Sequence, residues 1–199
     1  MSERDDRRGW RIASRETCYS GFYQIDSVSF QHDLFDGGST GLVERELFVR
    51  GNVVGLLAYD PVADKVALIE QFRIGAMYQH PHPWLTEIIA GMIDTDETPE
   101  AVAMREAREE AGLVLKQVQL IHHYLASPGS SNEEVFVYYA ETDLNGVSGT
   151  HGLAHENEDI RVRVVSAEEA FNMVDTRTVR NALSIIALQW LKLKRAGLN

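Results

Sequence analysis

Hydrophobic positions in the first half of the chain form short runs separated by turn residues, a pattern typical of β-strands. Residues 15–33 predict two short strands around Gly21, and residues 42–51 predict a third after a turn at 37–40. The runs "NVVGLLAYD" and "KVALIEQF" flank the turn "PVAD" and predict a hairpin that is buried on at least one face. The stretch "WLTEIIAGMI" is strand-like up to Gly91.

The second half mixes helical and strand periodicity. A helix is expected to start near Thr98, because Pro99 suits a first helical position and Gly112 suits the position just past the end. Further strands are expected within residues 118–127, 134–142 and 160–166.

Two helices are expected to close the chain. The second, within residues 178–197, has apolar residues at helical spacing, and its Trp190 and Leu191 are expected in the core rather than against a cofactor. Strands, one central helix, more strands and then helices predict an α+β fold with a mixed β-sheet.

Composition adds limits on the class of protein. The chain has 199 residues, 44% of them hydrophobic, and a net charge of −11, which argues against nucleic acid or an anionic membrane as a partner. Cys18 is the single cysteine, so an intramolecular disulfide is excluded. We expect a cytoplasmic protein, because the N-terminal residues show no secretory leader and the longest apolar run is too short to cross a bilayer.

The helix expected to start near Thr98 carries an unusual concentration of glutamates. At about 100° per residue, Glu106, Glu109 and Glu110 share one helix face. One interpretation is a solvated surface on which Arg105 and Arg108 offset the repulsion. However, the carboxylates lie near the C-terminal end of the helix, where the helix dipole disfavours anions. Mg²⁺ would relieve the repulsion, because it binds carboxylates together with water and substrate phosphates.

This stretch resembles the Nudix box. The matching residues are Gly91, Glu97, Arg105, Glu106, Ala107, Glu109, Glu110, Gly112 and Leu113. Ala107 is smaller than the aliphatic residue usual in the box.

Pro128 and the acidic loop "HGLAHENEDIRV" resemble features of one group within this family, the bacterial ADP-ribose pyrophosphatases. The resemblance to that group extends from about Arg15 to Leu193. It implies a mixed sheet sandwiched between helices, with a small N-terminal antiparallel β domain. It also implies that residues 1–48, exchanged across a homodimer, precede a Nudix domain at 49–199.

For activity, the resemblance implies Mg²⁺-dependent hydrolysis of ADP-ribose, and of other ADP-sugars, to AMP and a sugar phosphate. Each site would take two or three Mg²⁺ ions, for which Mn²⁺ can substitute. Two alternatives stay open: a pyrophosphatase for GDP-mannose or another nucleotide sugar, and a nucleotide-sugar sensor without catalysis. An intact box argues against the sensor.

The resemblance also implies residue roles. Glu156 is the expected general base, with Glu133 and Glu134 as rivals in another loop, and neighbouring His155 is more simply a surface histidine. The expected metal ligands are the Ala90 carbonyl, Glu106, Glu109, Glu110 and Glu158.

Substrate contacts and structural residues complete the expectations. The expected substrate-binding residues are Phe22, Arg45, Arg73, Met92 and Ser127, of which Phe22 and Arg45 would serve the partner's site. A core position for Phe22 and structural ion pairs for the two arginines are the simpler alternatives. Gly91, Glu97, Arg105 and Gly112 are expected to be structural, with Glu97 and Arg105 as an ion pair.

Overall fold

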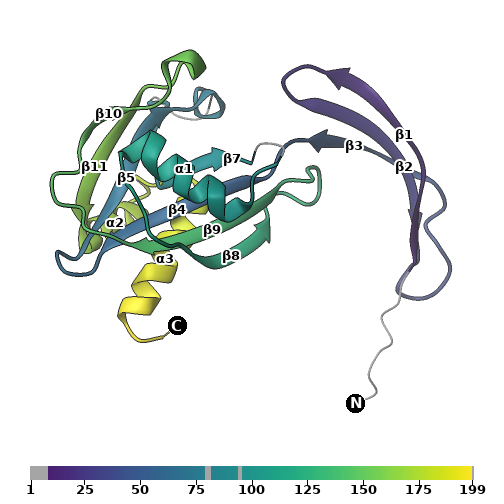
Figure 1. The fold of residues 1–199 in the computed structure, drawn as a ribbon. Helices are drawn as coiled ribbons and strands as arrows, with labels where there is room; N and C mark the ends of the chain where they lie inside the picture. Colours follow the sequence, from purple (N-terminus) through teal and green to yellow (C-terminus); the bar gives the residue numbers. More distant parts are fainter. Residues whose placement is uncertain (1–8, 79–81, 94–95, 199) are drawn as a thin grey trace. The chain divides into compact units, whose positions relative to one another are not determined.

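The computed structural model describes residues 9–78, 82–93 and 96–198 and divides the chain into two compact units (Figure 1). The N-terminal unit comprises Met1–Gly51 together with Leu125–Glu133. The larger unit comprises Asn52–Tyr124 and Glu134–Asn199.

The N-terminal unit is a three-stranded antiparallel sheet in the order β1-β2-β3. Its strands are β1 (Trp10–Ser20), β2 (Gln24–His32) and β3 (Val43–Val49). Every residue of β1 is exposed, and the unit's main buried polar side chain is Asp26, which Arg15 contacts. A sheet this thin buries little apolar surface of its own.

The larger unit is built on an eight-stranded mixed sheet in the order β10-β11-β5-β4-β9-β8, with β6 paired to β5 and β7 to β4. Strands β4 and β9 are parallel, whereas the other pairs whose register is described are antiparallel. The strands are β4 (Val53–Asp60), β5 (Lys65–Phe72), β6 (Trp84–Glu87), β7 (Ile89–Met92), β8 (Gln119–Leu125), β9 (Glu134–Glu141), β10 (Gly149–His151) and β11 (Ile160–Ser166).

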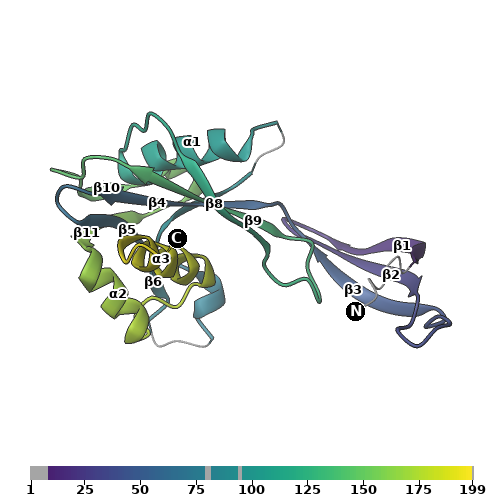
Figure 2. The same cartoon turned by 90° about the horizontal axis from the view of Figure 1, so that it is seen from below.

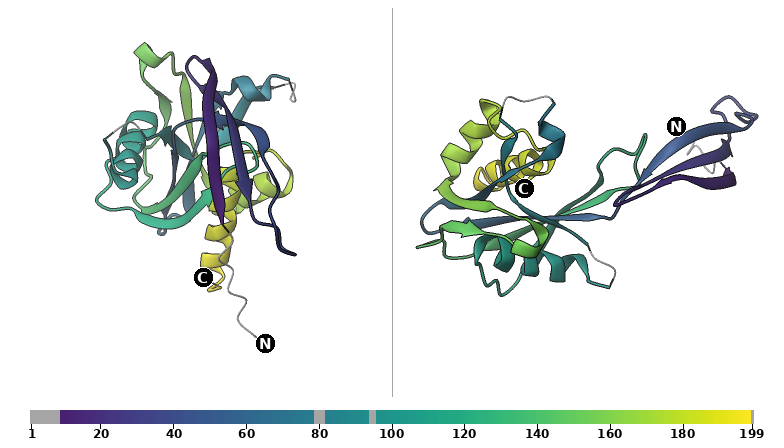
Figure 3. Two further views of the ribbon diagram at one scale, coloured as in Figure 1. Left: turned by 90° about the vertical axis from the view of Figure 1, so that its right-hand side faces the viewer. Right: turned by 90° about the horizontal axis from the view of Figure 1, so that it is seen from above.

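Three α-helices cover the two faces of this sheet. Helix α1 (Pro99–Ala111) lies on one face, and α2 (Ala167–Asp175) and α3 (Ala182–Arg195) lie on the other, as two views show (Figure 2 and Figure 3). Two buried clusters correspond to these layers: Val102, Ala103 and Ala107 belong to one, and Leu188 and Leu191 to the other. The expected α+β sandwich is confirmed.

Several details differ from the expectations. Strand β1 begins at Trp10, five residues earlier than expected, and the run ending at Met92 is two strands interrupted at Ile88. The break arises because β6 pairs with β5 and β7 with β4. Strand β10 and the 3₁₀ turns η1 (Ile74–Ala76) and η2 (Ala154–Glu156) were not expected.

Leu191 is fully buried and Trp190 packs against the same cluster, as expected. The division after residue 48 and the exchange of the first domain across a dimer stay predictions.

Candidate active site

Helix α1 is bounded by local signals at both ends. The Thr98 side chain accepts a hydrogen bond from the Ala101 N–H at 3.2 Å, and Pro99 occupies the first helical turn. Gly112 ends the helix in the left-handed conformation, with φ 65°, which glycine adopts without steric cost. Ala107 lies fully buried on the face that packs against the sheet. The carboxylates of the last turns are therefore held on a well-anchored helix.

Glu110 is the most buried carboxylate of this helix. Its residue is 2% exposed, and its Oε2 accepts a hydrogen bond from the Ala90 N–H at 2.9 Å. Burial raises the pKa of Glu110 to about 8, and the negative charges of Glu106 and Glu158 act in the same direction. Ionising this group thus costs free energy unless a cation compensates.

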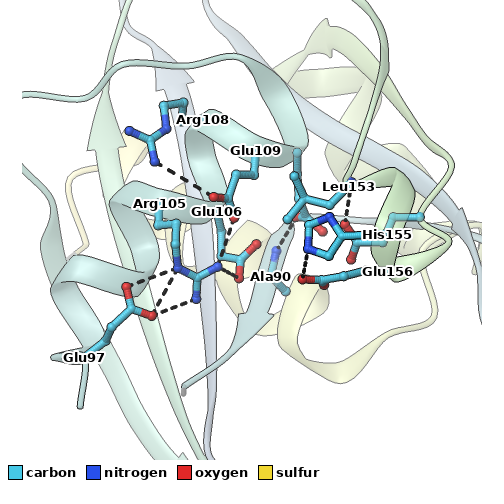
Figure 4. A network of polar contacts seen from close by, with 11 residues as sticks. Ala90, Glu97, Arg105, Glu106, Arg108, Glu109, Leu153, His155 and Glu156 are labelled. Atoms are coloured by element: carbon cyan, nitrogen blue, oxygen red, sulfur yellow. Dashed lines mark hydrogen bonds and ion pairs between the residues drawn. The ribbon is translucent and has the colours of Figure 1, made fainter. Parts of the chain in front are cut away.

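Arg105 links Glu97, which precedes the helix, with Glu106 and Glu109 on the helix (Figure 4). Its Nε donates to both Glu97 oxygens at 3.1 Å, and its Nη1 donates to Glu106 at 2.8 Å and to Glu109 at 3.0 Å. Burial nevertheless raises the pKa of Glu106 to about 7; Arg105 lowers it, whereas Glu109 and Glu158 raise it further. The Arg105 side chain therefore lies at the centre of an ion-pair network of three glutamates.

Gly91 allows strand β7 to approach this network closely. A Cβ atom at this position would lie 1.8 Å from Glu106 Oε1, far inside contact distance. Any other residue at position 91 would displace the Glu106 side chain. The glycine of the expected box thus leaves room for the Glu106 side chain in its observed position.

The acidic loop joins the same region through its backbone. The Gly152 N–H donates to the Glu109 carbonyl at 3.3 Å, which ties the loop to the end of α1. Glu158 accepts from the Leu153 N–H at 3.2 Å, and its charge acts on both Glu106 and Glu110. Glu156 lies in η2 with a 54% exposed side chain, and one of its oxygens is 3.4 Å from His155 Nε2. The structure thus places Glu158 and Glu156 in the loop attached to the carboxylate helix.

The rival bases have partners of their own. Glu133, in the N-terminal unit, lies 3.4 Å from Arg50 Nε. Glu134, on β9, contacts His123 Nε2 at 2.7 Å.

The expected substrate contacts divide between the two units. Arg73 and Met92 belong to the larger unit with the carboxylates, and Met92 pairs with Val53 across β7 and β4. The three other candidates, Phe22, Arg45 and Ser127, belong to the N-terminal unit.

The surroundings of Phe22 and Arg45 can be compared with the simpler alternatives, a core position for Phe22 and a structural ion pair for Arg45. Phe22 is 83% exposed and meets Tyr23 edge to face, so it is not a core residue of its unit. Arg45 Nη1 donates to the Glu44 carbonyl at 2.7 Å, and Ser127 accepts backbone hydrogen bonds from Ser130 and Ser131 through its carbonyl.

Two polar residues of this region were missed by sequence reasoning. Glu87 is 2% exposed and pairs with Arg73 Nε at 2.7 Å, so the simpler alternative of an ion pair for Arg73 is present in the structure. Asn181 Nδ2 donates to the other Glu87 oxygen at 2.7 Å. A single charge inside the apolar run "WLTEIIAGMI" was the available signal for Glu87.

The carboxylates fit a divalent cation by their chemistry. Within the described ranges, no three side chains of the usual metal-binding types converge closely enough to cage an ion in this arrangement, because Glu106 and Glu109 turn to Arg105. Glu110 is buried and Glu106 is half-buried, and both have raised pKa values to which the charge of Glu158 contributes. Their carboxylates are nevertheless oxygen donors that a hard cation would stabilise in the ionised form. The donor set therefore suits Mg²⁺ or a similar ion.

The chain is similar to known proteins over most of its length. Residues 49–188 match the NUDIX domain family. The ADP-ribose pyrophosphatase of Escherichia coli (strain K12) is 49% identical over 187 residues, covering 94% of this chain and 90% of that protein. The corresponding enzyme of Haemophilus influenzae is 43% identical, covering 94% and 88%.

More distant similarities also exist. The GDP-mannose pyrophosphatase of Enterobacter sp. (strain 638) is 34% identical, covering 75% of this chain and 78% of that protein. The crystal structure of an ADP compounds hydrolase shares the fold, with a TM-score of 0.71 at 18% identity, covering 96% of this chain and 97% of that one. Across the residues that the structure describes, no helix has the length and apolarity needed to span a membrane.

Proposed function

The chain belongs to the Nudix family, and on that premise we propose that it hydrolyses the pyrophosphate bond of ADP-ribose to AMP and ribose 5-phosphate. The observation that carries this proposal is 49% identity to an ADP-ribose pyrophosphatase across 94% of the chain. Other ADP-sugars, which share the ADP half of the substrate, are proposed as further substrates.

Hydrolysis of a pyrophosphate requires that negative charge be neutralised and a water be deprotonated. Nudix hydrolases generally need a divalent metal, which supplies charge neutralisation at the phosphate oxygens. We propose that Glu106 and Glu110 hold Mg²⁺, two or three ions per site with Mn²⁺ as a substitute. Glu109, Glu158 and the Ala90 carbonyl are proposed as additional ligands.

The proposed base is Glu156. Its carboxylate is partly exposed on η2, where a water and a substrate can reach it. It takes the proton of the water that attacks phosphorus, and AMP leaves with the electron pair of the broken P–O bond when the attack occurs on the ribose-linked phosphorus. Attack on the other phosphorus yields the same two products.

Substrate recognition is proposed to combine both units. Arg73 and Arg45 are proposed to contact phosphate or ribose, and Phe22 is proposed to stack on adenine. Met92 and Ser127 are proposed as further substrate contacts. Arginine suits phosphate because its planar fork matches the oxygen spacing.

We propose that the protein works as a homodimer in which Phe22 and Arg45 serve the partner's site. The N-terminal sheet supports this, because Trp10, Ile12 and Tyr19 are exposed on β1 although they are large and apolar. A second copy would cover such a surface. The expected cytoplasmic location also stays a prediction.

The decisive experiment is product analysis with purified protein and Mg²⁺. ADP-ribose, ADP-glucose, GDP-mannose, NADH and diadenosine polyphosphates are compared at equal concentration, with EDTA as the control. We expect ADP-ribose to give the highest kcat/KM, with AMP and ribose 5-phosphate as products and no turnover in EDTA. A preference for GDP-mannose would leave the proposed pyrophosphate hydrolysis in place but refute the proposed preference for adenine over guanine. Binding of ADP-ribose without turnover would favour the sensor.

A further inference from the structure

Glu87 is a buried carboxylate to which the proposed chemistry assigns no role. It ends strand β6 and is 2% exposed, and each of its two carboxylate oxygens accepts a hydrogen bond. Oε2 accepts from Arg73 Nε and Oε1 from Asn181 Nδ2, each at 2.7 Å. The two donors come from different elements, since Arg73 follows β5 and Asn181 precedes α3.

Asn181 connects Glu87 to the start of helix α3. Its Oδ1 accepts from the Ser184 N–H at 3.1 Å and so caps the helix, while its Nδ2 contacts Glu87. Ser184 Oγ in turn accepts from the Ile88 N–H at 2.9 Å. The N-terminus of α3 is therefore tied to β6 and to the following residue, and these ties set the orientation of the Glu87 carboxylate.

Arg73 contacts Glu87, and its charge also favours the ionised form of Glu110. The Arg73 side chain is 40% exposed. An ion pair with one partner buried is weak evidence for a role in stability, because removing the carboxylate from water costs free energy that the attraction offsets. The Arg73–Glu87 ion pair is better explained by the position in which it holds the Arg73 guanidinium.

We propose that Glu87 and Asn181 are positioning residues that hold the Arg73 guanidinium where it binds a phosphate of the substrate. This inference rests on the proposed function only in requiring a substrate with a pyrophosphate. The pair restricts Arg73 to one orientation before the substrate arrives, so binding loses less conformational entropy.

Three variants test the proposal in steady-state kinetics. Glu87→Gln keeps the volume and removes the charge, Arg73→Gln removes the proposed phosphate contact, and Asn181→Ser keeps a helix-capping hydroxyl while removing the donor to Glu87. We expect Glu87→Gln to raise KM about tenfold with kcat within about twofold, in line with loss of one hydrogen bond to a charged group. Asn181→Ser, which leaves both charges in place, is expected to raise KM about threefold to tenfold.

A double variant and a matched control separate positioning from stability. In the Arg73→Gln background, adding Glu87→Gln is expected to change KM by less than about twofold, because the two residues act through one contact. Ser166→Ala removes the cap of α2, which accepts from the Glu169 N–H at 3.1 Å. It is expected to lower Tm without changing KM.

Unchanged KM in both Glu87→Gln and Asn181→Ser would overturn the proposal. An equal rise in Ser166→Ala, or additive effects in the double variant, would do the same. A wild-type preference for GDP-mannose would refute the proposed function alone, and the same series with GDP-mannose would then decide. If the wild-type protein cleaves neither ADP-ribose nor GDP-mannose, the variants are compared by their Kd for ADP, measured by calorimetry, in place of KM. Absence of ADP binding would overturn both the proposed function and the positioning role.

Discussion

Two buried carboxylates of the larger unit, Asp60 and Glu110, have opposite surroundings. Asp60 ends β4 and receives three backbone hydrogen bonds, from Val62 and Ala63 at 2.9 Å and from Leu144 at 3.2 Å. The hydrogen bonds from Ala63 and Leu144 outweigh burial and lower the pKa of Asp60. The folded chain itself therefore satisfies this negative charge.

Glu110 receives one backbone hydrogen bond, from Ala90, and lies among other carboxylates. Burial and the charges of Glu106 and Glu158 raise its pKa to about 8, although Ala90 and Arg73 act in the opposite direction. The contrast teaches that burial alone does not identify a functional acid. A buried carboxylate that the chain leaves undercompensated is the one that favours an external cation.

The largest expected effect is that of Glu110→Gln. The amide keeps the volume and the acceptor for Ala90 but removes a proposed metal ligand, so we expect kcat to fall by about 10³-fold, equivalent to roughly 4 kcal/mol. Tm in EDTA should not fall, because the substitution relieves repulsion. Glu100→Gln, on an exposed position of the same helix, is the control. Turnover within about tenfold of wild type would rule out Glu110 as an essential ligand.

Glu156→Gln is expected to lower kcat by about 10²-fold, the usual contribution of a general base. The protein should stay folded and bind Mg²⁺ with unchanged affinity, as calorimetry would measure. Glu134→Gln serves as the comparison, since Glu134 begins β9 and contacts His123 of the neighbouring strand β8. Near-normal turnover in Glu156→Gln with loss in Glu134→Gln would instead assign the role of general base to Glu134 at the start of β9.

Local features of the site could be predicted from the sequence. The bounds of α1 follow from Thr98, Pro99 and Gly112, which act within a few residues of the helix ends. The shared face of Glu106, Glu109 and Glu110 follows from helix geometry alone. These predictions succeeded because each depends on contacts that are close in sequence.

Features that depend on distant contacts escaped prediction. Glu87 and Asn181 are 94 residues apart, and no periodicity brings them together. The interruption at Ile88 follows from the divergence of β4 and β5, which is a property of the sheet rather than of the run itself. Strand β10 has three residues, too few for an alternating pattern to appear.

Asp60→Asn should affect stability rather than catalysis. An amide in place of the carboxylate turns one NH₂ group toward backbone N–H donors, so at least one donor loses its acceptor. We expect Tm to fall by roughly 3–8 °C with kcat and KM unchanged. Asp143→Asn, an exposed neighbour, is the control and should leave Tm unchanged. A loss of kcat in Asp60→Asn at unchanged Tm would contradict the contrast between the two carboxylates.

The smallest expected effect is a pH dependence of stability in the metal-free protein. The pKa values of Glu106 and Glu110 are raised to about 7 and about 8 from 4.5, so the folded state binds more protons than the unfolded state between these limits. Stability from these groups is therefore fully present below pH 4.5 and is lost as pH rises toward 8. Tm measured in EDTA should fall over this range in wild type and less steeply in Glu110→Gln.

Groups with lowered pKa values, Asp60 among them, lose their contribution at lower pH, so they do not mask this trend near neutrality. Added Mg²⁺ should flatten the wild-type curve, because the cation favours the ionised carboxylates over the protonated ones. Equal slopes in wild type and Glu110→Gln would mean that Glu110 is ionised without a cation. In that case Glu110 and Asp60 would differ in where they lie in the fold, and not in how well the folded chain compensates their negative charges.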